Sequence, residues 1–137
     1  MGLFELLFER KNPGRVGRIE ENNKKPKPVG LFTLLIKLSL SSAIIYLLLF
    51  IFVLHNFSAV RLAYFVFFML LYCFIAYKFI PRPDKSNVGW FGGLVDNPFR
   101  YTDDINRFLI FLMILLYPGR FIATTFVQFI MFLRGKR

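Results

Sequence analysis

The chain has 137 residues, of which 56% are apolar and 19% aromatic, and it carries 18 Lys and Arg residues against 8 Asp and Glu residues. Soluble domains average about 45–50% apolar residues, so a chain that is both very apolar and strongly basic must separate its charges from its apolar segments. One cysteine allows no disulfide framework, and the length is too small for a two-domain enzyme. The composition predicts an all-α integral membrane protein.

Residues 1–11 have the pattern of a short amphipathic surface helix. Leu3, Phe4 and Leu7 share one helical face, and two glutamates lie on another. A helix of this length is not stable alone in water. We therefore expect its apolar face to contact a partner protein or the membrane surface.

Residues 12–28 are rich in Pro, Gly and Asn and predict an irregular basic linker. Lys24, Lys25 and Lys27 precede the first apolar segment, and Lys37 lies near its start. Such clusters attract the headgroups of anionic phospholipids, by about 1 kcal/mol per basic residue near the surface. The alternative is that they only set the orientation of the chain. The basic run has no aromatic interleaving and no recognition motif, which indicates no nucleic-acid partner.

Two apolar segments, residues 29–54 and 59–80, predict transmembrane helices. The connection between them is so short that the two helices are expected to form an antiparallel hairpin. Pro81 and Pro83 end the second segment, because proline does not continue a helix easily.

Basic residues predict the orientation of the hairpin, because loops rich in Lys and Arg stay on the cytoplasmic side. Between the uncharged parts of the two segments, residues 55–61 carry only Arg61 as a basic residue besides His55. Eight basic residues precede the uncharged part of the first segment: Arg10, Lys11, Arg15, Arg18, Lys24, Lys25, Lys27 and Lys37. The N-terminus is therefore expected in the cytoplasm, with a bacterial inner membrane as the predicted location and an organelle membrane as the alternative.

Residues 81–107 form the polar connection that follows the hairpin, and we expect them on the cytoplasmic side. Trp90, Phe91 and Phe99 lie there among glycines. So short a segment does not bury these side chains in a domain of its own. Two interpretations stay open: the aromatic side chains lie in the membrane interface, or they dock onto another subunit.

Residues 108–133 are a third hydrophobic segment, followed by the basic tail 134–137. Pro118 and Gly119 near its middle predict a break, and neither half is long enough to cross alone. A segment that turns back there leaves the tail in the cytoplasm, as the positive charges favour. The alternative is a kinked third span with the tail outside.

Arg120, Thr124 and Gln128 form one stripe on the second half of this segment. In a third span the stripe would need a partner, because an arginine at mid-membrane costs about 2.5–3.5 kcal/mol and the chain has no acid there. In an interfacial segment it would face water and headgroups.

Groups that carry chemistry are few. His55 is the only histidine, Cys73 is the only cysteine, and the apolar segments hold no carboxylate. We predict no catalytic residue, no metal and no cofactor. The predicted function is an accessory or structural subunit of a larger complex, whose partners are other integral membrane subunits and anionic phospholipid. Two alternatives stay open: a pore-former, since small size, few spans and a basic tail resemble phage holins, and a haem- or quinone-binding subunit using His55.

Overall fold

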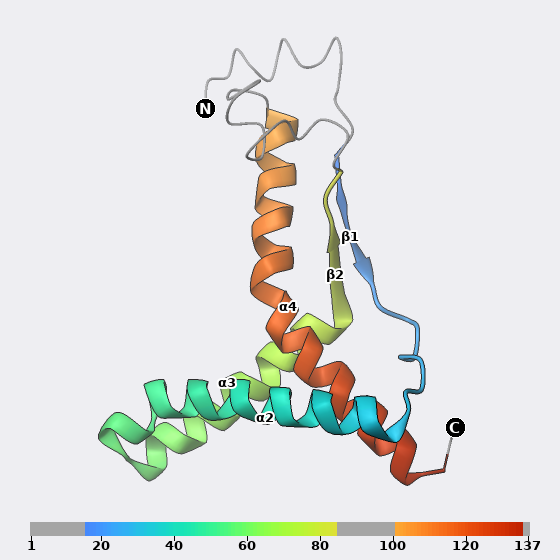
Figure 1. Ribbon diagram of the computed structural model, residues 1–137. Helices are drawn as coiled ribbons and strands as arrows, with labels where there is room; N and C mark the ends of the chain where they lie inside the picture. The colour runs from blue at the N-terminus through green and yellow to red at the C-terminus, as the bar shows by residue number, and fades with distance from the viewer. Residues whose placement is uncertain (1–15, 85–100, 136–137) are drawn as a thin grey trace. The chain divides into compact units, whose positions relative to one another are not determined.

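The computed structural model describes residues 16–84 and 101–135 (Figure 1). The chain divides into two compact units, one from residues 1–21 and 79–115 and the other from residues 22–78 and 116–137. Helix α4, Tyr101–Leu133, contributes its first part to the first unit and its last part to the second.

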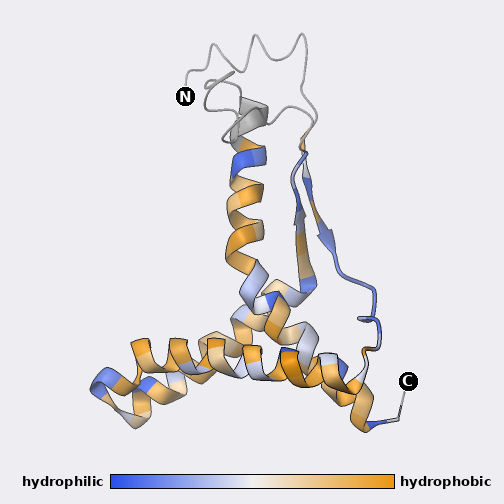
Figure 2. Ribbon diagram, viewed as in Figure 1, coloured by the Kyte–Doolittle hydropathy of each residue, from blue (hydrophilic) through white to orange (hydrophobic). Residues whose placement is uncertain are grey.

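The described residues contain three helices that are long and apolar enough to cross a membrane, with candidate spans Leu31–Asn56, Ala59–Lys78 and Ile105–Leu133. The first contains α2, Leu31–Phe52, and a short 3-10 turn η1, Leu54–Asn56; the second is α3, Ala59–Lys78. Figure 2 shows their predominantly apolar character. The predicted mainly helical, membrane-embedded protein is thereby confirmed.

Most side chains of α2 and α3 are exposed. In α2 the buried side chains are Leu34 and Ser41, and in α3 the buried side chain is Ala76. Helix α2 is apolar on all sides and has no glycine or proline in its interior, so nothing in its sequence interrupts the helix. Apolar helices with so little covered surface require lipid or another protein around them.

A two-stranded antiparallel sheet was not predicted from the sequence. Strand β1, Arg18–Glu21, pairs with β2, Phe79–Arg82, and Ile19 lies opposite Pro81. Ile80 and Arg82 each precede a proline, and a residue in that position avoids the helical region and favours extended backbone. The predicted linker 12–28 is thus partly a strand, and the second apolar helix ends at Lys78 rather than at residue 80.

Asn22 terminates α3 from outside the helix. Its backbone N–H donates to the Lys78 carbonyl at 2.7 Å, and its side-chain Nδ2 donates to the Tyr77 carbonyl at 3.1 Å. The last carbonyls of a helix have no hydrogen-bond donor within the helix. Asn22 supplies donors to two of them, the carbonyls of Tyr77 and Lys78. The segment that precedes α2 is thereby attached to the end of α3.

The predicted reversal at Pro118–Gly119 is wrong, because α4 continues through both residues. Pro118 has no N–H to donate, and backbone groups freed near a proline can be satisfied by a neighbouring helix inside a membrane protein. Here the N–H of Gly119, the residue after the proline, donates to the Tyr72 hydroxyl of α3 at 3.1 Å. The glycine permits this close approach instead of turning the chain.

Candidate functional site

Six of the predicted partner-contact residues lie outside the described residues: Leu3, Phe4, Leu7, Trp90, Phe91 and Phe99. The amphipathic helix predicted at residues 1–11 and most of the connection 81–107 also lie outside them. The candidate site is therefore built from the second unit, where the predicted lipid-contact lysines and the polar stripe of α4 come together.

The buried positions of the last part of α4 differ from the predicted stripe. Gly119, Ile122, Thr125 and Gln128 are buried and recur every three residues, so the buried surface winds around the helix instead of following one face. Of the three residues in the predicted stripe, only Gln128 is buried.

Gln128 joins α4 to the start of α2. Its side-chain Oε1 accepts a hydrogen bond from the Lys37 Nζ at 3.1 Å, and its Nε2 donates to the Lys27 carbonyl at 2.8 Å. The side chain is only 7% exposed, so both ends of the amide are used in a place where an unpaired polar group would be costly. The buried amide of Gln128 thus finds its partners within the same chain.

The four predicted headgroup contacts separate into two kinds. Lys24, Lys25 and Lys27 are exposed before α2, whereas Lys37 is half-buried inside α2 and points its ammonium to Gln128. A lysine stem can cover apolar surface while its charged end reaches a polar group. Exposure leaves the other three ammonium groups accessible, and their contact with anionic headgroups stays a prediction.

Arg120 and Thr124 behave differently from Gln128. The Thr124 hydroxyl donates to the Arg120 carbonyl at 2.8 Å, a bond within the helix. The Arg120 side chain is half-exposed and has no hydrogen bond or ion pair to the part of the chain that the structure describes. Its guanidinium therefore has all its donors available for water, a phosphate or an acid of another molecule.

Helices α3 and α4 meet at a close contact around Gly119. A Cβ atom added there would lie 2.5 Å from the Tyr72 Cε1 and 3.0 Å from the Ala76 Cβ. Only a glycine on α4 and an alanine on α3 leave room for this approach. The contact places Gly119 beside the last two turns of α3.

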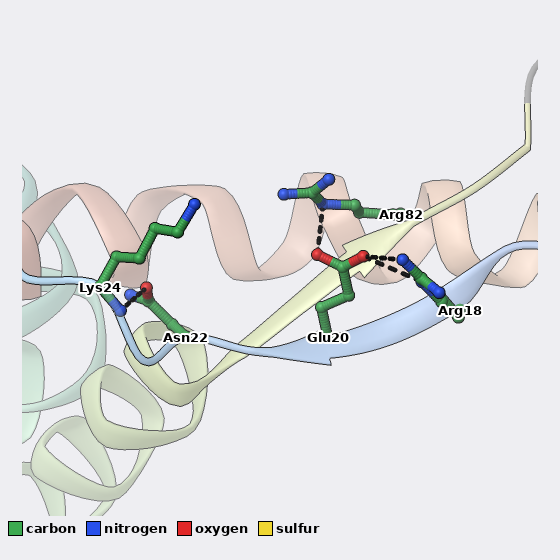
Figure 3. Close-up of polar contacts among 5 residues, drawn as sticks. All are labelled: Arg18, Glu20, Asn22, Lys24 and Arg82. Carbon is green, nitrogen blue, oxygen red and sulfur yellow. Dashed lines mark hydrogen bonds and ion pairs between the residues drawn. The ribbon is translucent and has the colours of Figure 1, made fainter.

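The sheet of the first unit carries a small charge cluster. The Glu20 carboxylate pairs with the Arg18 Nη2 at 2.7 Å and with the Arg82 Nε at 2.9 Å (Figure 3). The two arginines lie directly opposite each other in the register, so the carboxylate separates like charges. Asn106 of α4 holds the open end of this sheet: its buried Oδ1 accepts from the Gly17 N–H at 2.8 Å and from the Asp84 N–H at 3.2 Å.

The residues considered for cofactor binding form no site within the described ranges 16–84 and 101–135. His55 is exposed in η1, Cys73 is half-buried in α3, and those ranges contain no cluster of three metal-ligating side chains.

Two features of the candidate site were missed from the sequence. The partnership of Lys37 with Gln128 joins residues far apart in the chain, and no local spacing indicates it. Asn106 was also missed, although an asparagine among polar residues just before an apolar helix is a signal that could have drawn attention to it.

Comparison with protein-family models, curated proteins and solved structures found no match to this chain. The function is therefore inferred from the chain's own geometry.

Proposed function

We propose that this chain is a small non-catalytic accessory subunit of a larger membrane protein complex, which binds other integral membrane subunits and anionic phospholipid. The observation that carries the proposal is the exposed apolar surface of α2 and α3. Phe67, Leu70 and Phe74 form one face of α3 and are between 61% and 67% exposed. Two helices with so little mutual cover suit a subunit whose faces are completed by partners and lipid.

The absence of intramembrane charge in this pair supports a non-catalytic function. From Leu38 to Val60, α2 and the turn after it contain no acid and no basic residue other than His55. Enzymes and ion-coupled transporters usually carry ionisable groups within the membrane. A helix pair without them is better suited to packing than to chemistry.

We further propose that α2 and α3 form a transmembrane hairpin whose open end faces the cytoplasm. The basic residues before α2 support this orientation, because positive loops are retained on that side. Asn22, bonded to the Lys78 carbonyl, supports a common location for both open ends.

The C-terminal end of α4 belongs on the same side in this arrangement. Gln128, in the last two turns of α4, bonds the Lys27 carbonyl just before α2, and Gly119 lies against the last two turns of α3. Both contacts are at the open end of the hairpin. We therefore propose that residues 116–133 lie along the cytoplasmic interface, where Arg120 reaches headgroups and water.

Site-specific labelling tests this topology. Single cysteines at the exposed Asn23 and at the half-buried Ser58 in the turn, in a background that carries Cys73→Ser, would be challenged with a membrane-impermeant maleimide, together with an epitope tag after Arg137. We expect labelling from outside at Ser58 only, and an inaccessible tag. An externally accessible tag would mean that α4 crosses the membrane, and labelling at Asn23 would overturn the orientation.

Purification in a mild detergent tests the accessory function. A tagged chain should recover larger membrane proteins in fixed stoichiometry. Phe67→Ala with Phe74→Ala should reduce that recovery several-fold, because both remove exposed aromatic surface from α3. Phe57→Ala is the matched control, because Phe57 is also exposed but lies in the turn. A ladder of homo-oligomers without larger partners would favour the pore-former instead.

A further inference from the structure

An apolar groove lies between α2 and α3 on the second unit. Its volume is about 430 Å³, and its walls include Leu48 and Phe52 of α2 and Phe65, Phe68 and Met69 of α3. Ligand-binding pockets in proteins commonly have volumes of ~300–1,000 Å³. The groove is therefore large enough for a flexible hydrocarbon chain.

One end of the groove carries a positive charge. Arg61, in the first turn of α3, is the only charged residue among the lining side chains. Its Nη1 donates to the Asn56 carbonyl at 2.9 Å, which holds the guanidinium against the turn that joins the helices. The remaining donors of the guanidinium point to a site for a planar or tetrahedral anion, because arginine presents five N–H groups.

The groove has a charged end and an apolar end along α3. Arg61 lies at the turn, and Tyr72, at the other end of the lining, is eleven residues further along α3. At about 1.5 Å per residue the apolar part runs roughly 16 Å into the membrane from the charged end. Tyr72 lines the inner end, where its hydroxyl accepts a hydrogen bond from the Gly119 N–H.

Resting on the membrane hairpin of the proposed function, we propose that this groove binds one anionic phospholipid, with an acyl chain between α2 and α3 and the phosphate on Arg61. An apolar trough with a single cation at its membrane-surface end matches the charge distribution of such a lipid. No acid lies between Val53 and Arg61, so the local charge is positive and favours a headgroup without its own ammonium. The site is distinct from the lysine cluster before α2.

Native mass spectrometry of the full chain released from detergent micelles tests the proposal. Dioleoyl-phosphatidylglycerol and dioleoyl-phosphatidylcholine would be titrated separately. We expect one retained phosphatidylglycerol and markedly weaker retention of phosphatidylcholine. Arg61→Gln should weaken phosphatidylglycerol binding about tenfold, as expected from losing one charge-assisted contact, and Arg61→Lys should retain most of it.

Variants that fill the groove separate chain binding from headgroup binding. Met69→Trp and Leu48→Phe narrow the groove from opposite helices and leave Arg61 in place, so each should reduce retention. Two variants are used so that a folding failure in one, judged by helicity, leaves the other to decide. Arg134→Gln is the matched control, since Arg134 is an exposed arginine just after α4, and it should have no effect.

Three outcomes would overturn the proposal. Retention that survives both groove-filling variants would place the lipid outside the groove. Equal retention of the two lipids, or equal loss with Arg134→Gln, would remove Arg61 as the anion-binding group. A wild-type chain that retains no lipid but forms a dimer through Leu48 and Met69, detected by cysteine cross-linking, would make a second copy the occupant.

Discussion

The two units each contain a glycine at a close contact, and the two contacts are built differently. A Cβ at Gly17 would lie 2.6 Å from the Pro83 Cα and 2.8 Å from the Asp84 N, both backbone atoms. A Cβ at Gly119 would meet side chains, Tyr72 and Ala76. Backbone atoms beside a sheet have little freedom to withdraw, whereas the far end of a tyrosine side chain can swing aside about the Cα–Cβ bond.

The hydrogen bonds at the two glycines also differ. The Gly17 N–H donates to Asn106, which also accepts from the Asp84 N–H, so one buried side chain serves two backbone donors. The Gly119 N–H donates to a single hydroxyl, that of Tyr72. The sheet of the first unit therefore depends on one residue more strongly than the helix contact of the second unit does.

The largest effect is expected from Asn106→Ala, which removes the acceptor from two backbone N–H groups. An unsatisfied buried donor costs about 1–3 kcal/mol, and because both of these N–H groups are only part-buried, each should cost free energy of unfolding toward the lower end of that range. Hydrogen exchange of the amides of β1 should accelerate in proportion, with little change in α2. Asn23→Ala, at an exposed asparagine, is the control. Unchanged exchange in β1 would show that Asn106 does not hold the sheet.

A smaller effect is expected from Gly17→Ala. The new methyl group overlaps backbone atoms of Pro83 and Asp84, and overpacking typically costs about 1–3 kcal/mol. The same exchange measurement on β1 and β2 reports it. If Gly17→Ala leaves the exchange rates of both strands unaltered, the segments before β1 and after β2 move apart without cost, and the contrast between the two glycines disappears.

Sequence patterns predicted the parts of this fold that depend on composition. The apolar runs around Leu38–Leu54 and Leu62–Tyr77 have only one structural solution in a membrane, so α2 and α3 were expected within a few residues of their ends. The sheet was missed because RIEE and FIPR are too short to show alternation.

Pro118–Gly119 was misjudged for a tertiary reason. Proline followed by glycine is a turn signal, and the signal was outweighed by a hydroxyl from another helix, Tyr72. Gln128 shows the same limitation. Its position on a polar stripe was evident, but its partners, Lys27 and Lys37, lie about a hundred residues away in the chain and follow only from packing.

Gly119→Ala is expected to lower the free energy of unfolding by about 1 kcal/mol, less than Gly17→Ala does. The reason is that the far end of the Tyr72 side chain can swing away from the added methyl group. Unfolding by SDS of the detergent-purified protein measures it. Adding Tyr72→Leu should recover part of the loss, because it removes the atoms that the methyl would meet. Gly30→Ala is the control, since a Cβ at Gly30 has no neighbour within 4 Å. A loss as large as that of Gly17→Ala would mean that the ring is as immobile as backbone.

The smallest effect is expected from Glu20→Gln. Arg18 and Arg82 lie opposite each other in the sheet, and the Glu20 carboxylate pairs with both. Both arginines are well exposed, so solvent screens their ion pairs with Glu20. The free energy of unfolding should therefore fall by only about 0.2–1 kcal/mol. Hydrogen exchange in β1 should report a small acceleration that fades as salt is raised, since salt screens the uncovered repulsion of the arginines. Adding Arg18→Gln should reverse the acceleration, because Arg82 then has no positive charge opposite it. An acceleration that persists in high salt would instead assign Glu20 a structural function beyond charge.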